Sequence, residues 1–427
     1  MADANKTLIY CTNSYPSDVY SEKVFADSEL EAFREYFDRI ILLPVDDLGH
    51  KLGFESQLPD GVEVDWSLTR QKATHSRLVK LFYIFHPYVV RSLIDVTREA
   101  RSASQWLKGF MQAANTITIA RAVKKVLHNN KLLPGNSVLY SLWFLDTASA
   151  NAYIASKYGW KCITRAHTSD LYDIDTHRIF RSAEVRRRLL GHIESVITIS
   201  EHGRRYLANK FPEHISKFKV IRLGSNRSIQ PGSYSLADGV SRPLEIYTVA
   251  RITDCKRLSL IVDIIQKIAH YTPDRKIRWT LIGDGDYRRE ELLAQIESAD
   301  EPNLELRHAG LLKNEEIQEI YAKRPPQWFM LMSDTEGLPV SMGEAMSYGI
   351  PVITTDVGQI GELVDSKSGL MFPVDVDPDE CARMLANMIF DTERQRSMSL
   401  EAVAAWESRF NASVLAHQTA ALVNALL

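Results

Sequence analysis

The chain has 427 residues, of which 45% are hydrophobic and 25% are charged, and its formal net charge at pH 7 is -3. Because a single hydrophobic core stops growing at roughly 250–300 residues, this length predicts two domains. The small net charge excludes a global attraction to nucleic acid. The cysteines lack C-x-x-C spacing, so neither a zinc site nor a disulfide framework is expected. They are Cys11, Cys162, Cys255 and Cys381.

The start of the chain, MADANKTLIYCT, holds an apolar run that is too short for a secretory signal. No stretch approaches the run of about 18 apolar residues that a membrane-spanning helix needs. The sequence therefore predicts a cytoplasmic protein, or one that lies at most on the inner face of the plasma membrane.

The first half alternates strands with helices. The continuous apolar run of Arg39–Val45 is typical of a parallel sheet covered on both faces. A helix is expected near Glu22–Tyr36, and Gly53–Trp66 has no clear period and stays unassigned. The other strands are expected at Thr7–Thr12, Ser137–Trp143, Cys162–Ala166, Ser195–Ile199 and Lys219–Arg222.

Between about Arg70 and Asn130 the pattern is helical and rich in spaced basic residues. One interpretation is a set of packed helices with solvated basic faces, and the other is a face that lies against anionic lipid. Further arginines follow at Arg178, Arg181 and Arg186–Arg188. They would suit a polyprenyl-diphosphate-linked acceptor at the membrane, or they simply solvate a helix.

A segment crowded with Gly, Pro and Ser, Gly224–Pro243, predicts the linker between the domains. The second half alternates strictly between strands and helices, which predicts a doubly wound parallel sheet. Its strands are expected at Leu244–Val249, Ile277–Leu281, Leu304–His308, Trp328–Met332 and Val352–Thr354. Its helices are expected near Leu258–His270, Tyr287–Glu297, Asn314–Ala322, Pro339–Tyr348, Pro378–Phe390 and Ser397–Phe410. The predicted domains are residues 1–230 and 243–408, with a last helix, 409–427, that returns to the first domain.

The segment Ser333–Gly358 places a polar turn between a strand and a helix. A helix that starts at Pro339 offers free backbone N–H groups and a positive dipole end, which suit phosphate, and Gly337 leaves room for their approach. Glu336 and Glu344 flank this site, and carboxylates there suit sugar or ribose hydroxyls. The alternatives are a capping box for Glu344, since Ser341–Glu344 reads S-x-x-E, and a solvated turn residue for Glu336.

Two cations follow the first strand of the second half, Arg251 and Lys256. Such a pair can stabilise a diphosphate leaving group in the crevice of a parallel sheet, or it can be two surface charges. The glycines Gly283 and Gly285 lack the G-x-G-x-x-G spacing of a dinucleotide fold, so NAD binding is not expected.

The segment Ser333–Gly358 resembles the EGxPxxxxE signature of the retaining glycosyltransferases of family 4, which have the GT-B fold of two Rossmann-like domains facing a central cleft. One departure is Gln359, where that family usually has a second glycine. The resemblance continues upstream, in the right order, through Val249–Leu258, Leu281–Gly285 and Gly310–Glu316.

In the first half, Glu22–Pro44 and Thr164–Tyr172 resemble members of that family that build bacterial surface polysaccharides. Thr168 replaces a usual glycine, and Thr12–Val19 stands where some relatives carry a glycine-rich phosphate loop. The resemblance implies that His167 touches the donor sugar, with Asp170 able to orient its ring. A lone histidine is otherwise more often structural.

The resemblance implies a retaining hexosyltransferase that uses a UDP- or GDP-linked sugar without a metal. Its acceptor would be a glycan or a lipid-linked oligosaccharide. The catalytic residues would be Glu336, His167, Arg251 and Lys256. Donor-binding residues would be Arg251, Lys256, Gly283, Leu311, Glu336, Gly337, Leu338, Pro339 and Glu344. The alternatives are a nucleotide-sugar epimerase and an inactive nucleotide-sugar-binding or scaffold subunit.

Overall fold

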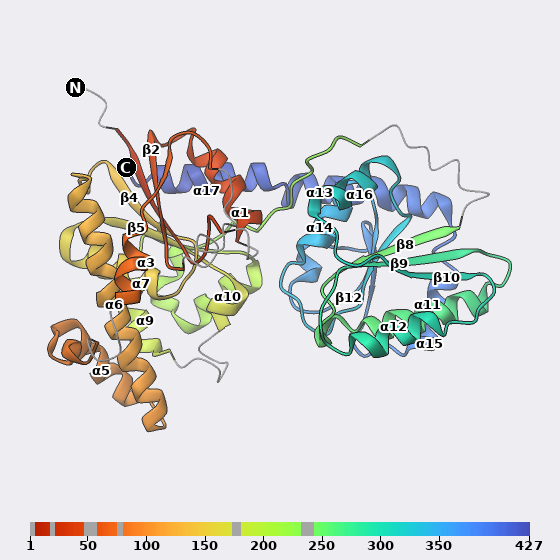
Figure 1. Cartoon of the computed structure of the whole chain (residues 1–427), viewed down its shortest axis with the longest axis horizontal. Coiled ribbons are helices and arrows are strands. Elements are labelled where there is room, and N and C mark those ends of the chain that lie inside the picture. The colour runs from red at the N-terminus through yellow and green to blue at the C-terminus, as the bar shows by residue number, and fades with distance from the viewer. Residues whose placement is uncertain (1–4, 18–21, 47–57, 75–79, 173–180, 232–242) are drawn as a thin grey trace. The chain divides into compact units, whose positions relative to one another are not determined.

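A computed structural model of the chain describes residues 5–17, 22–46, 58–74, 80–172, 181–231 and 243–427 (Figure 1). Its internal contacts divide the chain into two compact units. Unit 1 is Met1–Arg222 together with Ser413–Leu427, and unit 2 is Leu223–Ala412. The C-terminal helix therefore belongs to the same unit as the N-terminal strand.

Unit 1 is built on a seven-stranded parallel sheet in the order β3-β2-β1-β4-β5-β6-β7. Side chains alternate between its faces, so Leu8 and Tyr10 lie in one core cluster and Ile9 and Cys11 in the other. The strands are β1 (Thr7–Thr12), β2 (Arg39–Pro44), β3 (Val62–Val64), β4 (Ser137–Ser141), β5 (Lys161–Ala166), β6 (Ser195–Thr198) and β7 (Phe218–Val220).

Helices cover both faces of this sheet. On one face lie α1 (Lys23–Phe33) and α17 (Ala412–Asn424), which are far apart in sequence and share a core cluster. The other face is covered by α3 (Ser67–Thr74), α6 (Ala103–Asn129), α7 (Asp146–Tyr158), α9 (Ala183–Leu190) and α10 (Glu201–Lys210). A short 3₁₀ helix, η1 (Phe82–Phe85), and α5 (Pro87–Glu99) pack on α6 (Figure 1).

Unit 2 has a six-stranded parallel sheet in the order β10-β9-β8-β11-β12-β13. Its strands are β8 (Leu244–Val249), β9 (Ile277–Ile282), β10 (Leu304–His308), β11 (Trp328–Leu331), β12 (Val352–Thr355) and β13 (Gly369–Phe372). One face packs on α11 (Leu258–Tyr271), α12 (Arg289–Glu297) and α15 (Pro378–Ala386). The other packs on α13 (Asn314–Lys323), α14 (Val340–Ser347) and α16 (Thr392–Arg409).

The doubly wound parallel sheets are as predicted, and some element bounds differ. The edge strand β13 was not predicted, because four residues beginning with Gly369 give little periodic signal. Helix α16 begins at Thr392 rather than Ser397, since Asp391 caps it by accepting from the backbone N–H of Arg394 at 3.0 Å. The unassigned segment contains β3, and residues 47–57 and 232–242 lie outside the described ranges.

Three of the cysteines, Cys11, Cys162 and Cys381, are buried free thiols, and Cys255 is half-buried. Burial raises the pKa of the Cys11 and Cys381 thiols to about 12, so both stay protonated. Within the described residues, no helix combines the length and apolarity needed to cross a bilayer.

Candidate functional site

The strongest cluster of predicted site residues lies where the strand order of the second sheet reverses. Strands β8 and β11 are neighbours there, and parallel sheets bind ligands at the carboxyl ends of such strands. Lys256 follows β8 in η5 (Asp254–Lys256), and Glu336 follows β11. The ammonium of Lys256 forms an ion pair with Oε1 of Glu336, although 80 residues separate them. Neither is a freely solvated surface charge.

Short hydrogen bonds hold the turn that carries Glu336. The hydroxyl of Ser333 donates to the same carboxylate oxygen of Glu336 at 2.7 Å. The backbone N–H of Asp334 donates to the carbonyl of Cys255 at 3.0 Å, which ties the loop after β11 to the loop after β8. Arg257 donates to the carbonyl of Ser333 at 3.2 Å. The carboxylate is therefore fixed on both its side-chain and its backbone side.

Gly358, which follows β12, leaves room for the backbone of the turn that carries Glu336. Gly358 has a φ of +57°, and a Cβ there would lie 1.9 Å from the carbonyl oxygen of Glu336. Among the described residues with positive φ, Gly358 is present and Gly337 is not. Gly358 therefore allows the close packing of two backbone segments at this turn, and the approach of a ligand to Gly337 stays a prediction.

Glu344 lies inside α14 and is buried, with 6% of its surface exposed. The amide of Asn314 donates to its Oε1 at 2.7 Å, and burial raises the pKa of Glu344 to about 7. The capping-box alternative is wrong, because Pro339 is the cap residue of α14 and Glu344 binds Asn314. The helix thus begins at Val340, one residue after the predicted start.

Other predicted donor residues lie in the segments after β8, β9, β10 and β11. Arg251 is exposed and makes no side-chain hydrogen bond or ion pair with any described residue. Gly283 is pressed against the loop that carries Arg251, since a Cβ there would lie 2.0 Å from the carbonyl oxygen of Ala250. Leu311 is exposed at 78%, and Leu338 is partly buried against the core.

In unit 1 the strand order reverses between β1 and β4, and a buried carboxylate occupies that position. Glu22 accepts hydrogen bonds from the backbone N–H groups of Asn13 at 2.8 Å, Ser14 at 2.5 Å and Tyr15 at 2.8 Å. It also accepts from the indole N–H of Trp143, which follows β4. Because these amides already bind a carboxylate, this loop is not an open phosphate cradle.

His167 follows β5 and contacts the ring of Trp143 in a tilted arrangement, with ring centroids 4.2 Å apart and an interplanar angle of 37°. The residue is buried, and neither ring nitrogen has a hydrogen-bond partner among the described residues. Asp170 does not orient the ring as expected: it accepts from the backbone N–H of His167 at 2.5 Å, and Nδ1 lies 3.9 Å from its other oxygen. An unpaired buried imidazole is costly, so it marks a position that a hydroxyl or phosphate ligand can satisfy.

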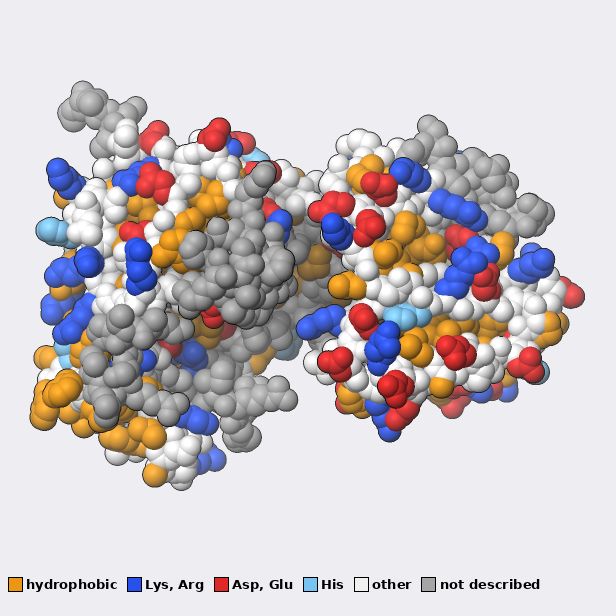
Figure 2. Space-filling model, viewed as in Figure 1, with side chains coloured by type: hydrophobic (Ala, Val, Ile, Leu, Met, Phe, Trp, Pro, Cys, Tyr) orange, Lys and Arg blue, Asp and Glu red, His pale blue; other side chains and the backbone are white. Residues whose placement is uncertain are grey.

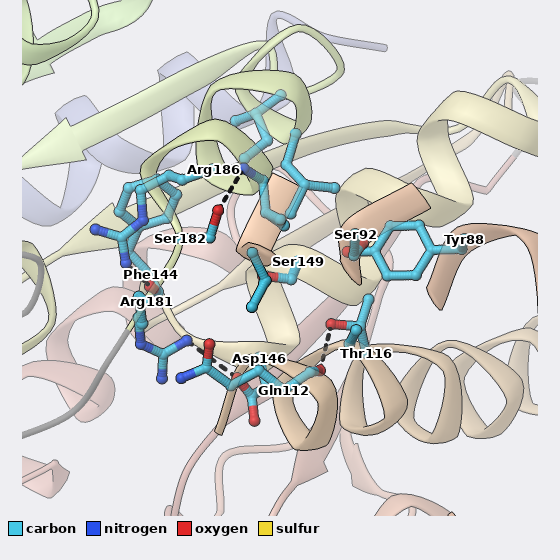
Figure 3. Close-up of a pocket in the computed structure, with 16 residues that line it drawn as sticks. Tyr88, Ser92, Gln112, Thr116, Phe144, Asp146, Ser149, Arg181, Ser182 and Arg186 are labelled. Carbon is cyan, nitrogen blue, oxygen red and sulfur yellow. Dashed lines mark hydrogen bonds and ion pairs between the residues drawn. The ribbon is translucent and has the colours of Figure 1, made fainter. Parts of the chain in front are cut away.

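The predicted arginines make ion pairs and a ring contact within unit 1. Figure 3 shows Arg181 reaching Asp146 beside a pocket between α5, α6, α7 and α9, and their ion pair measures 3.1 Å. Arg186 lies over the ring of Phe144, with 4.3 Å to the ring centroid. Arg187 and Arg188 pair with Glu213 and Asp95. These residues therefore do not form a solvated basic surface, and Arg178 lies outside the described residues.

Sequence reasoning assigned no role to Glu22, Trp143, Ser333 and Asn314. Glu22 stands in a segment that was quoted for its resemblance, and its place just before α1 was the available signal. Trp143 and Asn314 act through contacts between elements that are distant in sequence, which no local pattern reports.

Part of unit 2 is similar to a known protein family. Residues 243–391 match the family described as Glycosyl transferases group 1. This stretch lies within unit 2 and contains both carboxylates and the Lys256 ion pair.

Two curated relatives are glycosyltransferases. The amylovoran biosynthesis glycosyltransferase AmsK of Erwinia amylovora is 28% identical over 220 residues, which are 49% of this chain and 51% of AmsK. The O-antigen biosynthesis glycosyltransferase WbnH of Escherichia coli is 28% identical over 158 residues, 37% of this chain and 41% of WbnH. The chain thus matches about half the length of these relatives or less.

A solved structure resembles the chain over nearly its whole length. Anabaena HepE, crystallised with UDP, superposes with a TM-score of 0.64 over 98% of this chain and 100% of HepE, at 16% identity. Together with the two parallel sheets, this likeness confirms the predicted GT-B fold.

Proposed function

We propose that this chain is a retaining glycosyltransferase that moves a hexose-type sugar from a nucleoside-diphosphate sugar to a hydroxyl group. The acceptor is a glycan or a polyprenyl-diphosphate-linked oligosaccharide, and the product belongs to surface polysaccharide biosynthesis. The names of AmsK and WbnH support the polymer-building role. UDP in the HepE structure supports a nucleotide donor, UDP- or GDP-linked. The proposal includes no metal and no nucleic acid, and it places the enzyme in the cytoplasm.

The observation that carries the proposal is the ion pair of Lys256 and Glu336 at the strand-order reversal of the second sheet. A cation there stabilises the negative diphosphate that leaves, and Arg251 adds a second positive charge on the same loop. The carboxylate of Glu336 accepts hydrogen bonds from sugar hydroxyls. Glu344, deeper in α14, suits the ribose hydroxyls, and His167 suits a sugar hydroxyl or a phosphate oxygen.

In the proposed reaction the acceptor hydroxyl attacks the anomeric carbon from the face on which the diphosphate departs. The bond between that carbon and the phosphate oxygen breaks as the new glycosidic bond forms. The acceptor proton moves to the departing phosphate oxygen, so configuration is retained without a covalent sugar–enzyme intermediate. Lys256 and Arg251 hold the charge that develops on the phosphate.

A thermal-shift screen with UDP, GDP, ADP and their sugars tests the donor class. A ligand that binds only the native state raises its stability by RT ln(1 + [L]/Kd), so one nucleotide is expected to raise the melting temperature selectively. The same protein is then incubated with the matching nucleotide sugar and a lipid-linked acceptor. No stabilisation by any nucleotide would overturn the proposal, and donor turnover into an epimer without transfer would reassign it.

A further inference from the structure

Unit 1 exposes an unusual concentration of large apolar side chains on η1 and α5. Phe82 is 78% exposed and Phe85 is 85% exposed. Figure 2 shows hydrophobic side chains gathered at the end of this unit where Figure 1 labels α5. We define the α5 patch by its exposed apolar residues, Leu81, Phe82, Ile84, Phe85, Val90 and Ile94. Contiguous exposed apolar surface of this kind marks an interaction site.

The outer stripe of α5 mixes apolar and basic residues. Val90, Arg91, Ile94 and Arg98 are exposed at helical spacing, whereas Val89 and Val96 are buried against the rest of the unit. A helix whose solvent-facing stripe is apolar and basic, rather than polar throughout, is typical of a helix that lies in a membrane interface.

The charge of this region is strongly one-sided. From Lys80 to Lys125 the sequence has eight Lys and Arg residues and only two acids, Asp95 and Glu99. Both acids point inward: Asp95 pairs with Arg188 at 2.6 Å, and Glu99 accepts two backbone N–H groups at the start of α9, each at 2.9 Å. The two acids of α5 are therefore engaged by residues of α9, and no ion pair joins them to Arg91 or Arg98 in the described part of the chain.

The exposed basic residues are available for a partner. Arg91, Arg98, Arg101 and Lys108 are exposed and make no side-chain hydrogen bond or ion pair with any residue in the described part of the chain. Each basic residue held near an anionic lipid surface contributes roughly 1 kcal/mol to binding. The exposed phenylalanines strengthen binding further, because their rings are buried at the boundary between headgroups and acyl chains.

We infer that the α5 patch and its arginines dock unit 1 on a bilayer surface that carries anionic lipid. A second copy of the chain fits this surface poorly, because a symmetric contact would bring the same positive charges together. The inference goes beyond the proposed function, and its test does not depend on sugar transfer.

The test is co-sedimentation of the full chain with vesicles of phosphatidylcholine alone or mixed with phosphatidylglycerol. The wild type is expected to bind the phosphatidylglycerol vesicles only, and more weakly as salt rises. Loss of two charges in Arg91→Gln/Arg98→Gln is expected to weaken binding by about 30-fold. Phe82→Ser/Phe85→Ser is expected to abolish binding at the same lipid concentration.

Matched controls are available in unit 2 and at the end of α6. Arg394→Gln/Arg396→Gln removes two exposed arginines from α16, and Leu133→Ser/Leu400→Ser removes two exposed leucines. Both controls should bind as the wild type does, and circular dichroism checks that all variants fold. The inference would be overturned if the wild-type chain failed to bind phosphatidylglycerol vesicles. It would also be overturned if the patch variants bound these vesicles as strongly as the wild type. A dimer in sedimentation velocity that Phe82→Ser/Phe85→Ser dissociates would overturn it too, since the patch would then be a protein interface.

Discussion

At the scale of single residues, the candidate site contains two glutamates in different surroundings. Glu336 is paired with a cation and a hydroxyl at the end of a strand. Glu344 is buried with one amide donor, and its pKa is raised to about 7. Glu336 is thus anchored by an ion pair and a hydroxyl, whereas Glu344 is a buried carboxyl group whose pKa is raised by burial.

Glu336→Gln keeps the size of the side chain and removes the charge that binds Lys256. Transfer is expected to fall by at least about 100-fold, because the sugar and the ammonium lose their common anchor. The measurement is the initial rate of transfer, with the far-ultraviolet circular dichroism spectrum to show an unchanged fold. The control is Glu319→Gln, which removes an exposed Glu–Lys pair on α13 and should keep full activity. Equal activity of Glu336→Gln and the wild type would remove Glu336 from the site.

Glu344 makes the stability of the unliganded protein depend on pH. Its pKa rises from an ordinary 4.5 to about 7 on folding, so both states are protonated at low pH and no stability is lost there. As pH rises from about 4.5 through 7, the unfolded chain releases the proton first, and stability falls by up to about 3 kcal/mol.

Glu344→Gln removes this dependence. The variant is expected to match the wild type near pH 4 and to have the larger free energy of unfolding at pH 8, as measured by urea denaturation. Glu319→Gln again serves as the control for the pH dependence of an exposed glutamate. A constant difference between Glu344→Gln and the wild type across this range would contradict the raised pKa.

At the scale of elements, the loops after parallel strands place the site, and glycine sets how closely they approach. The loop after β12 carries Gly358 against the carbonyl of Glu336, and the loop after β9 carries Gly283 against that of Ala250. Both contacts join strand ends that are distant in sequence.

Gly358→Ala tests this packing. A Cβ would lie 1.9 Å from the carbonyl oxygen of Glu336, in a left-handed conformation that itself costs roughly 1–2 kcal/mol for a non-glycine residue. The expected results are a lower free energy of unfolding and a larger Kd for the stabilising nucleotide. Gly361→Ala is the control, since its Cβ would meet nothing closer than 3.7 Å. Normal nucleotide affinity in Gly358→Ala would show that the turn tolerates displacement.

The strands and the residues at their ends were largely predictable from the sequence. The contacts between distant segments were not, for physical reasons. Apolar runs bounded by turn residues gave the strands, and the rule for strand ends placed Lys256 and Glu336 at one edge of the sheet. The hydrogen bond of Asn314 to Glu344 joins α13 to α14, and the ring contact of Trp143 with His167 joins the segments after β4 and β5, so no local periodicity encodes them. The arginines after residue 180 pair with acids up to 93 residues away, which a local reading as a solvated face misses.

At the scale of the whole molecule, each unit places an acid at the reversal of its strand order, fully buried in unit 1 and partly buried in unit 2, with opposite consequences. In unit 2, Glu336 binds a side-chain cation that a diphosphate can share. In unit 1, Glu22 binds three consecutive backbone amides and an indole, and so fills the position that an anion would take. The proposed diphosphate site therefore lies in unit 2.

The last helix of the chain, α17, packs in unit 1, which also contains the first strand. Although α17 follows α16 of unit 2 in sequence, Ala416, Ala420 and Val423 pack in the core of unit 1. The hydroxyl of Thr419 accepts a 2.8 Å hydrogen bond from Arg165, a buried residue whose guanidinium also pairs with Glu29 at 2.6 Å. Helix α17 is thus a structural part of unit 1 and packs on the sheet that contains β1.

Neighbouring alanines on α17 provide a matched test of this role. Ala420 is fully buried and Ala421 is exposed, so Ala420→Glu forces an unpaired carboxyl into the core and Ala421→Glu leaves it in water. Ala420→Glu is expected to lower the free energy of unfolding by at least about 3 kcal/mol, because a buried charge without a partner must be desolvated or protonated. Ala421→Glu should change it by less than about 0.5 kcal/mol. Urea denaturation of both variants decides the matter, since equal stability would mean that α17 does not pack on the sheet of unit 1.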